Sequence, residues 1–304
     1  MKDSPLVSVC LITYNHKEYI VQAIESVLMQ KTSFGWELIV ADDYSTDGTR
    51  DILLEYQKQY PELITLILQE HNVGPAKNWM TLMEKPRTKY IAYFEGDDYW
   101  TDPLKLQKQV NVLEKNDELA IAAHGSYKLT DKLSLVESPF KTDTIWSTKD
   151  ILINNWYIMS ASLMFRKSMM ALWPDWIAEI SHGDLALILV TSLNGNGFYS
   201  PEPMSVYRIT KSGAMAKFTL EDSKKYILLM DHFNKMSGYK FDREISAIKE
   251  KSRKDILQQY LRQNQRANIV SRKYWQNIIQ SLKWAKPGEL PYVVRRIITD
   301  RKLK

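Results

Sequence analysis

Cysteine is almost absent from this chain of 304 residues. Cys10 is the only one, so no internal disulfide can form, and its place in the first apolar run predicts an inert core thiol. No apolar run approaches the roughly 18 to 20 residues that span a bilayer, and the N-terminus lacks the layout of a secretory signal. We therefore expect a cytoplasmic protein.

The glycine-rich loops of the common nucleotide-binding folds are also missing. Neither G-x-G-x-x-G nor G-x-x-x-x-G-K-[ST] occurs, and there is no internal repeat or low-complexity tract. The backbone phosphate cradles that such loops supply are therefore excluded.

Charge is distributed unevenly along the chain. Residues 1–215 hold 20 Lys/Arg and 27 Asp/Glu, a balance of −7, whereas residues 216–304 hold 21 and 9, a balance of +12. The two parts therefore have different electrostatic roles. We predict one domain at 1–215 and a basic helical region at 216–304.

The first 125 residues alternate between strand-like and helix-like patterns. Strands are predicted at 7–12, 36–41, 63–68, 90–94 and 119–123. Helices are predicted after Asn15, which suits an N-cap, at 49–60, at 75–84 and from Asp102 onward. Such alternation with short links is typical of an α/β fold with a mainly parallel sheet. Further on, a strand is expected at 160–166, a helix at 184–193, an extended segment at 197–209, and helices from about 217.

Polar residues follow three of the predicted strands. Tyr14 follows the first strand, the run DDYSTDGT (42–49) follows the second, and Glu95-Gly96-Asp97-Asp98 follows the fourth. In a parallel sheet these ends lie along one edge, where α/β proteins bind ligands. An aromatic ring can stack on a base, a carboxylate can accept a hydrogen bond from a ribose or a base, and another can hold Mg²⁺ or Mn²⁺. This edge is suited to a nucleoside diphosphate.

The motifs together resemble those of family 2 glycosyltransferases of the bacterial polysaccharide type. The similar segments are VSVCLITYN, DDYSTDGT, HNVGPAKN, YIAYFEGDDYWTDPLKLQKQV, a Gly-Asp before a helix, and VYRI. They occur in the family's order and cover about residues 5–212. The resemblance implies a GT-A fold, which has a Rossmann-like sheet flanked by helices.

The resemblance also implies a role for each matching position. Tyr14 is similar to the residue that packs on uracil, Asp43 to the carboxylate that accepts from uracil N3, and Asp97 to the ribose-side carboxylate. Asp98 resembles the ligand that holds Mn²⁺ or Mg²⁺ on the diphosphate. Asp184 matches the catalytic base, which deprotonates the acceptor hydroxyl in a single inverting displacement.

Two basic residues are weaker candidates for nucleotide-sugar binding. Lys77 is expected to face the donor sugar, and Arg208 to meet the diphosphate. Two positions depart from the family pattern: Glu95 stands where many relatives have Asp, and Thr210 stands near where many have His. Whether Glu95 or Thr210 contributes to the metal site is left open by the sequence.

The function implied is transfer of a sugar from a nucleotide sugar, expected to be a UDP-sugar, to a hydroxyl of a glycan or a lipid-linked acceptor. The expected setting is bacterial surface polysaccharide synthesis, such as capsule or lipopolysaccharide. A sugar nucleotidyltransferase is one alternative, although its usual Gly-rich phosphate loop is absent after the first strand. A non-catalytic, membrane-associated scaffold that keeps the fold is another.

The C-terminal segment is basic and aromatic. Residues 272–304 contain nine Lys/Arg against Glu289 and Asp300. An apolar helical stripe is predicted from Tyr274, Trp275, Ile278, Ile279 and Leu282. Such a helix can lie on an anionic membrane surface, here the inner face of the cell membrane, or pack on the catalytic domain. Nucleic acid is not expected as a partner, because no recognised binding motif accompanies the charge.

Overall fold

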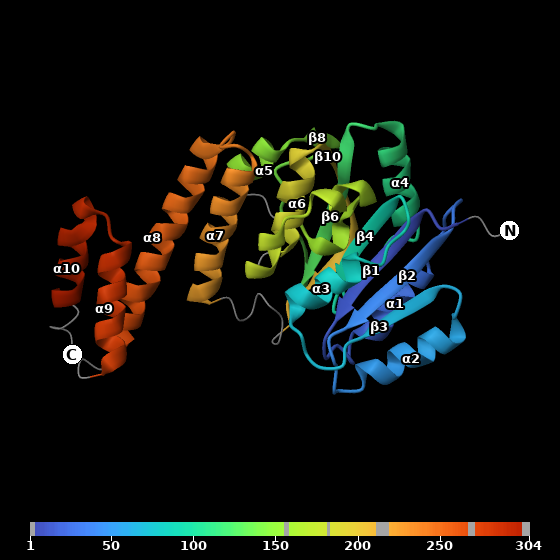
Figure 1. Cartoon of the computed structure of the whole chain (residues 1–304), viewed down its shortest axis with the longest axis horizontal. Helices are drawn as coiled ribbons and strands as arrows, with labels where there is room; N and C mark the ends of the chain where they lie inside the picture. Colours follow the sequence, from blue (N-terminus) through green and yellow to red (C-terminus); the bar gives the residue numbers. More distant parts are fainter. Residues whose placement is uncertain (1–3, 155–157, 181–182, 211–218, 267–270, 300–304) are drawn as a thin grey trace. The chain divides into compact units, whose positions relative to one another are not determined.

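The computed structural model describes residues 4–154, 158–180, 183–210, 219–266 and 271–299 (Figure 1). It confirms the predicted α/β fold with a central sheet and a helical C-terminal part. The strands are β1 (Val7–Thr13), β2 (Trp36–Asp42), β3 (Ile64–Leu68), β4 (Tyr90–Glu95), β5 (Tyr99–Trp100), β6 (Leu119–Leu129), β7 (Leu133–Leu135), β8 (Thr144–Trp146), β9 (Met164–Arg166) and β10 (Asn196–Arg208).

Helices connect these strands up to residue 217. They are α1 (Ile20–Leu28), α2 (Thr49–Gln59), α3 (Pro75–Met83), α4 (Lys105–Lys115), α5 (Thr148–Asn154) and α6 (Gly183–Leu193), with the short 3₁₀ helices η1 (Ser160–Ser162), η2 (Lys167–Leu172) and η3 (Asp175–Glu179). The helix predicted at 184–193 and the extended segment at 197–209 are therefore present within a residue of their expected bounds.

The sheet is parallel where helices link the strands and antiparallel elsewhere. Its order is β3-β2-β1-β4-β9-β6-β10-β5, with β7 paired to β6 and β8 paired to β10. The pairs β1–β2, β1–β4, β2–β3 and β6–β10 are parallel, whereas every pair that involves the short strands β5, β7, β8 or β9 is antiparallel. β7 follows its partner β6 after a short link, which allows an antiparallel hairpin but not a parallel crossover. The sheet is thus more mixed than the sequence predicted.

Two local predictions are wrong. The strand expected at 160–166 is limited to β9, because its first half forms η1. Asn15 is not the N-cap of α1, which begins five residues later. Asn15 instead adopts a positive φ of 53°, accepts from the Thr46 N–H through Oδ1 at 2.9 Å, and donates its own N–H to Ser45 Oγ at 2.9 Å. Its side chain therefore joins two loops rather than starting a helix.

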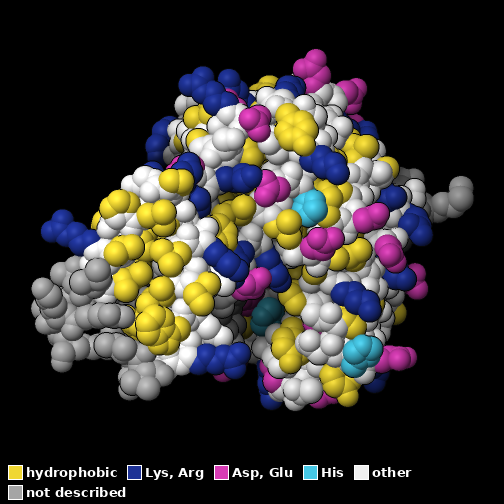
Figure 2. Space-filling model, turned by 60° about the vertical axis from the view of Figure 1, so that its left-hand side comes forward, with side chains coloured by type: hydrophobic (Ala, Val, Ile, Leu, Met, Phe, Trp, Pro, Cys, Tyr) yellow, Lys and Arg dark blue, Asp and Glu magenta, His cyan; other side chains and the backbone are white. Residues whose placement is uncertain are grey.

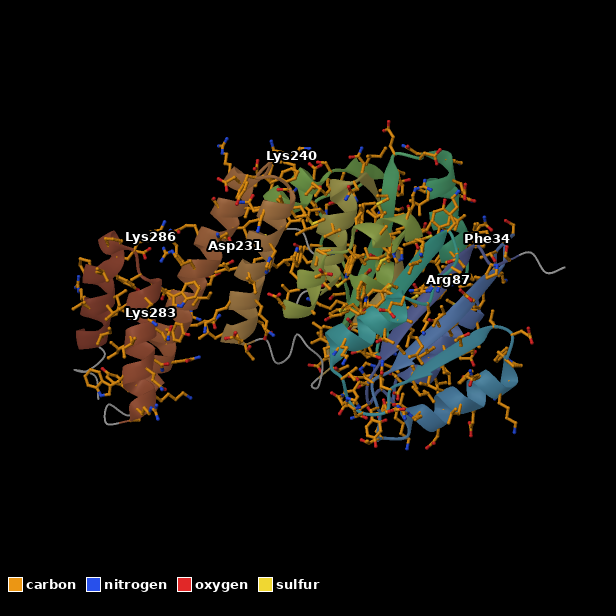
Figure 3. The ribbon with its side chains drawn as sticks, viewed as in Figure 1. Phe34, Arg87, Asp231, Lys240, Lys283 and Lys286 are labelled. Atoms are coloured by element: carbon orange, nitrogen blue, oxygen red, sulfur yellow. The ribbon has the colours of Figure 1, made fainter. Side chains whose placement is uncertain are left out.

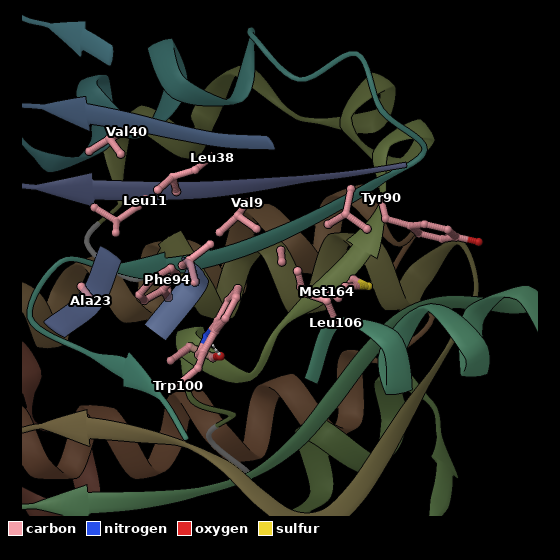
Figure 4. Packing of buried hydrophobic residues seen from close by; sticks show 14 of the residues in the cluster. Val9, Leu11, Ala23, Leu38, Val40, Tyr90, Phe94, Trp100, Leu106 and Met164 are labelled. Carbon is pink, nitrogen blue, oxygen red and sulfur yellow. Dashed lines mark hydrogen bonds between the residues drawn. The ribbon is translucent and has the colours of Figure 1, made fainter. Parts of the chain in front are cut away.

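The core lies on both faces of this sheet, because side chains alternate along each strand. Val9, Leu11 and Phe94 belong to one buried cluster, together with residues of α1, α2 and α4 (Figure 4). The opposite face carries Tyr93, whose ring meets Trp79 of α3 edge-on with centroids 6.3 Å apart. A strand buried on both faces reads as a continuous apolar run, which is why β1 and β4 were recognisable from sequence.

Residues 218–304 form a second compact unit, apart from residues 1–217. It contains α7 (Leu220–Met236), α8 (Asp242–Arg266), α9 (Arg272–Trp284), the 3₁₀ helix η5 (Pro287–Glu289) and α10 (Leu290–Thr299). Thr219 caps α7 in a reciprocal capping box with Asp222. Leu257, Leu261 and Val293 form a small core between α8 and α10. Among the described residues, no helix is both long enough and apolar enough to cross a membrane.

An ion-pair network fastens η5 to α8. Arg253 binds Glu289 through both terminal nitrogens, each at 2.8 Å from a carboxylate oxygen, and it also binds Glu250 at 2.8 Å. Lys286 adds a contact of 2.8 Å to Glu250 (Figure 3). These hydrogen bonds to Arg253 and Lys286 lower the pKa of both Glu250 and Glu289 to about 2. Bidentate pairs of this kind are the stronger class of surface interaction.

This network predicts a pH dependence of stability. The pKa of each carboxyl group is lowered from its ordinary value of 4.5. The stabilisation that these groups give the folded state is therefore complete above pH 4.5 and disappears as the pH falls toward 2. Arg253→Met should therefore lower the melting temperature at pH 7 but much less at pH 3, measured by circular dichroism. Arg243→Met, on an exposed position of the same helix, is the control. An equal loss at both pH values for Arg253→Met would contradict the assignment.

Candidate active site

The polar residues after β1, β2 and β4 meet at one edge of the sheet. Thr13 is in register with Asp42, and Ile12 with Glu95. Backbone hydrogen bonds continue just beyond the paired strands. The Asp43 N–H donates to Thr13 O at 3.0 Å, and the Gly96 N–H donates to Ile12 O at 2.8 Å. The structure therefore brings together the three loops that the sequence placed at a common edge.

Gly96 allows the loops after β1 and β4 to approach closely. A Cβ atom at this position would lie 2.9 Å from Thr13 Oγ1, 3.0 Å from Thr13 Cβ and 3.1 Å from His16 Nδ1. Real Cβ contacts are longer, so any larger residue must push the two loops apart. The glycine between Glu95 and Asp97 is thus a packing requirement of this edge.

Gly96→Ala is expected to cost about 1–3 kcal/mol of stability, because overpacking forces the neighbouring backbone to move. Urea unfolding of the purified chain measures the loss. Gly183→Ala is the matched control, since a Cβ there meets nothing within 4 Å and the position lies exposed at the start of α6. Equal effects of the two substitutions would contradict the packing argument.

Three carboxylates crowd the end of β4. Asp98 is fully buried, and its Oδ1 accepts from the Arg208 backbone N–H at 2.9 Å. Burial, together with the charges of Asp97 and Glu95, raises the pKa of Asp98 well above its usual value. Burial and the charges of Asp97 and Asp184 raise the pKa of Glu95 to about 8. Ionisation of all three carboxyl groups is therefore unfavourable at this edge, and a bound cation would stabilise their charged forms.

Several buried polar atoms at this edge have no hydrogen-bond partner. They are Thr13 Oγ1, His16 Nδ1, Asp42 Oδ1, Asp97 Oδ1 and Asp98 Oδ2. Each such atom costs roughly 1–3 kcal/mol when it is left unpaired. Five orphaned atoms in loops that touch one another are typical of a site that a polar ligand completes.

His16 also lies at this edge, although the sequence analysis assigned it no role. Its Nε2 lies 4.0 Å from Asp97 Oδ2, and its backbone N–H donates to Thr49 Oγ1 at 3.0 Å. Burial outweighs the nearby carboxylates and lowers the pKa of His16. A neutral imidazole at neutral pH offers one donor and one acceptor here. The signal was its position, two residues after Tyr14 in the same strand-end loop.

Asp43 holds a loop in place. Its Oδ1 accepts from the Val73 N–H at 2.7 Å and its Oδ2 from the Gly74 N–H at 3.0 Å. The residue is only 3% exposed. Each carboxylate oxygen retains a second lone pair, so a further donor can still be accepted. Asp42, by contrast, forms an ion pair of 2.7 Å with Arg50.

Tyr14 and Lys77 remain open to solvent. The Tyr14 ring is 45% exposed at the end of β1, beside the acidic edge. Lys77 is exposed in the first turn of α3, directly after the loop that Asp43 fixes. The next residue, Asn78, is buried and donates to Ala41 O at 3.0 Å, so α3 is anchored to the end of β2.

Arg208 ends β10 and clamps the acidic loop. Its guanidinium lies 5.1 Å from the Tyr19 ring centre and 4.4 Å from that of Tyr99, and it donates to Asp97 O and to Gln22 Oε1. Together with its backbone bond to Asp98, these contacts occupy the side chain within the protein. Arg208 therefore lies at the site, and two of the five N–H donors of its guanidinium are used within the protein.

Asp184 comes from a different part of the sequence but reaches the same surroundings. It lies in the first turn of α6, is partly exposed, and accepts from the Leu185 N–H at 2.8 Å. Its charge contributes to the raised pKa values of Glu95, Tyr93 and Tyr207. Asp184 therefore lies within the electrostatic surroundings of the acidic end of β4. Its preceding residue, at position 182, lies outside the described part of the chain.

This edge of the sheet can hold a metal ion that takes most of its ligands from phosphate oxygens and water. In the part of the chain that the structure describes, no three His, Cys, Asp or Glu side chains are grouped to hold a metal ion. Asp98 Oδ2 nevertheless is a buried, unpartnered carboxylate oxygen of the type that Mg²⁺ and Mn²⁺ prefer. These ions commonly bind through one or two carboxylates plus phosphate oxygens and water. The donor set therefore fits a metal–diphosphate complex.

The chain is similar to several known proteins. An uncharacterised protein of Mycobacterium tuberculosis is 35% identical over 202 residues, which are 66% of this chain and 58% of that protein. The Escherichia coli UDP-Glc:alpha-D-GlcNAc-diphosphoundecaprenol beta-1,3-glucosyltransferase WfgD is 34% identical over 134 residues, 44% of this chain and 50% of its own. The chain thus matches less than two thirds of the length of these relatives.

The fold is shared with solved glycosyltransferases. The crystal structure of Staphylococcus aureus TarS in complex with UDP-GlcNAc superposes with a TM-score of 0.64 at 17% identity, and the match covers 97% of this chain and 88% of that one. The family model described as "Glycosyl transferase family 2" matches residues 8–188, which is more than half of the chain. The protein is therefore a member of glycosyl transferase family 2 with a GT-A type fold.

Proposed function

We propose that the protein is a metal-dependent, inverting glycosyltransferase that moves a sugar from a UDP-sugar to a hydroxyl group of a glycan or lipid-linked acceptor. The observation that carries this proposal is the cluster of unpartnered polar atoms at the carboxyl ends of β1, β2 and β4, in a chain of family 2. The site residues below are proposed on the same ground.

The nucleoside is assigned to the strand-end loops. The exposed Tyr14 ring offers a flat surface on which uracil can stack. Asp43 accepts from uracil N3 through a remaining lone pair, and Asp97 accepts from the ribose through its unpartnered Oδ1. The complex of TarS with UDP-GlcNAc, a protein of the same fold, supports this class of donor.

The diphosphate is assigned to the end of β4. Asp98 Oδ2 is the protein ligand for Mn²⁺ or Mg²⁺, and Arg208 keeps the other oxygen of Asp98 in place. When bound, such an ion stabilises the negative charge that develops on the departing diphosphate. Lys77, exposed in the first turn of α3, is assigned to the donor sugar.

Asp184 is the proposed catalytic base. Its carboxylate takes the proton of the acceptor hydroxyl as that oxygen bonds to the anomeric carbon. The bond from this carbon to the diphosphate oxygen breaks at the same time, and UDP leaves with the electron pair. Attack from the face opposite the leaving group inverts the anomeric configuration. The partly exposed position of Asp184, at the start of α6, leaves room for an acceptor.

Bacterial surface polysaccharide synthesis is the proposed setting. The name of WfgD describes an acceptor linked to diphosphoundecaprenol, a membrane lipid. An acceptor of that class requires the enzyme to work at a membrane surface. We accordingly place the protein at the inner face of the cell membrane, attached peripherally through the basic region that begins near residue 216.

The test is donor hydrolysis by the purified chain with a panel of nucleotide sugars, with Mn²⁺ and then with EDTA. We expect release of the nucleoside diphosphate from at least one UDP-sugar, and loss of that release in EDTA. Turnover that is unaffected by EDTA would refute the metal requirement. Release of pyrophosphate from UTP and a sugar phosphate would instead show a nucleotidyltransferase.

A further inference from the structure

The apolar face of α9 is packed along one side only. The sequence grouped Tyr274, Trp275, Ile278, Ile279 and Leu282 into a single stripe. In the structure Tyr274 and Ile278 are 5% and 9% exposed, whereas Trp275, Ile279 and Leu282 are 49%, 52% and 40% exposed. The predicted stripe is therefore present, but three of its five residues, Trp275, Ile279 and Leu282, remain at the surface.

The exposed set forms a continuous band along the helix. Residues three, four and seven positions apart lie on the same face of an α-helix, as Trp275, Ile279 and Leu282 do. Figure 2 shows a face of the molecule on which hydrophobic side chains gather beside Lys and Arg. Neither this band nor its aromatic residue is needed for the small core of the helical unit, which Leu257, Leu261 and Val293 form.

Cations stand at both ends of the band. Arg272 precedes Trp275 by one turn, and Lys283 follows Ile279 by one turn; both are exposed. Lys286, labelled with Lys283 in Figure 3, follows α9 and is exposed, and its ammonium pairs with Glu250. No acidic residue occurs between 272 and 288, and the only one in η5, Glu289, is bound to Arg253. The surroundings of the band are thus positively charged.

We propose that the band of Trp275, Ile279 and Leu282, with Arg272 and Lys283 at its ends, binds the surface of an anionic lipid bilayer. Apolar side chains enter the acyl boundary, while Trp and the long cationic side chains suit the headgroup layer. A second copy is a poor occupant, because a region with a charge balance of +12 would face itself. Charge complementarity therefore favours anionic lipid.

This inference rests on the peripheral attachment proposed above and is independent of the transfer reaction. Binding to vesicles is measured without any sugar nucleotide. A failure to bind lipid would therefore leave the proposed sugar transfer intact, and a failure of sugar transfer would leave lipid binding intact. Each Lys or Arg near an anionic surface strengthens binding about fivefold, and the attraction weakens as salt is added.

The experiment is flotation of the full chain with vesicles of phosphatidylcholine, with and without phosphatidylglycerol. We expect binding to the anionic vesicles only, weakened by salt. Lys283→Gln should reduce it about fivefold. The double variant Trp275→Gln, Ile279→Gln should reduce it at least tenfold, because two half-exposed apolar side chains no longer enter the bilayer. Ile153→Gln, at a position of α5 that is 61% exposed, is the matched control and should bind normally.

Three results would overturn the proposal. They are no binding to anionic vesicles at low salt, equal binding of the wild type and the double variant, and a dimer in solution that the double variant converts to a monomer. The last result would assign the band to a second copy. Because all the substituted side chains are exposed, circular dichroism should show the same helix content and melting temperature in every variant.

Discussion

Replacing Asp98 by Asn should reduce donor turnover about 10³-fold, the scale seen when a group that stabilises transition-state charge is removed. The substitution keeps the shape of a fully buried side chain and removes one charged oxygen that has no partner. Without ligands, Asp98→Asn should be no less stable than the wild type, because it relieves the repulsion from Asp97 and Glu95 that raises the pKa of Asp98. Steady-state kinetics and thermal unfolding measure the two effects.

Glu95→Gln is the matched control for this prediction. It also removes a negative charge from the same crowded end of β4, where burial and neighbouring charges raise the pKa of Glu95 to about 8. It leaves Asp98 Oδ2 in place, so UDP with Mn²⁺ should still raise the melting temperature. If Asp98→Asn kept that thermal response as well, the assignment of Asp98 as metal ligand would be wrong.

Asp184→Asn should lower transfer to the acceptor by up to about 10⁴-fold, the upper range for loss of a general base. UDP binding in the presence of Mn²⁺ should remain, because Asp184 lies on α6 rather than on the loops assigned to the nucleotide. Single-turnover transfer and calorimetric titration with UDP separate the two steps.

A carboxylate in the first turn of a helix can also serve only to stabilise the helix, through its interaction with the helix dipole. Asp51 also lies in the first turn of a helix, α2, and is exposed, so Asp51→Asn is the matched control. Both variants should lose about 0.3–1 kcal/mol of stability from this effect, and only Asp184→Asn should lose transfer. Normal transfer by Asp184→Asn would show that Asp184 is not the catalytic base.

The edge of the sheet was predictable because its signals are local. Each of β1, β2 and β4 is a short apolar run, and each ends in polar residues that a strand interior would not accommodate. Parallel pairing then places those ends together whatever the loops do. The cluster around Glu95, Asp97 and Asp98 follows from this alone.

The contacts within the edge were not predictable, because they join residues that are far apart in sequence. Asp43 accepts from backbone N–H groups about thirty positions away, and Arg208 reaches Asp98 across 110 positions. His16 carries no sequence signal of its own beyond its loop. The exposed side of the α9 stripe was not predictable for a different reason: Tyr274 and Trp275 are both aromatic, so the pattern does not show which of them faces the core.

A crystal structure with UDP and Mn²⁺ tests the central claim most directly. The account predicts an ion about 2.1 Å from Asp98 Oδ2 that also contacts the diphosphate oxygens, with the uracil against Tyr14. UDP held at this edge with no ion beside Asp98, or an ion bound in another part of the molecule, would contradict it.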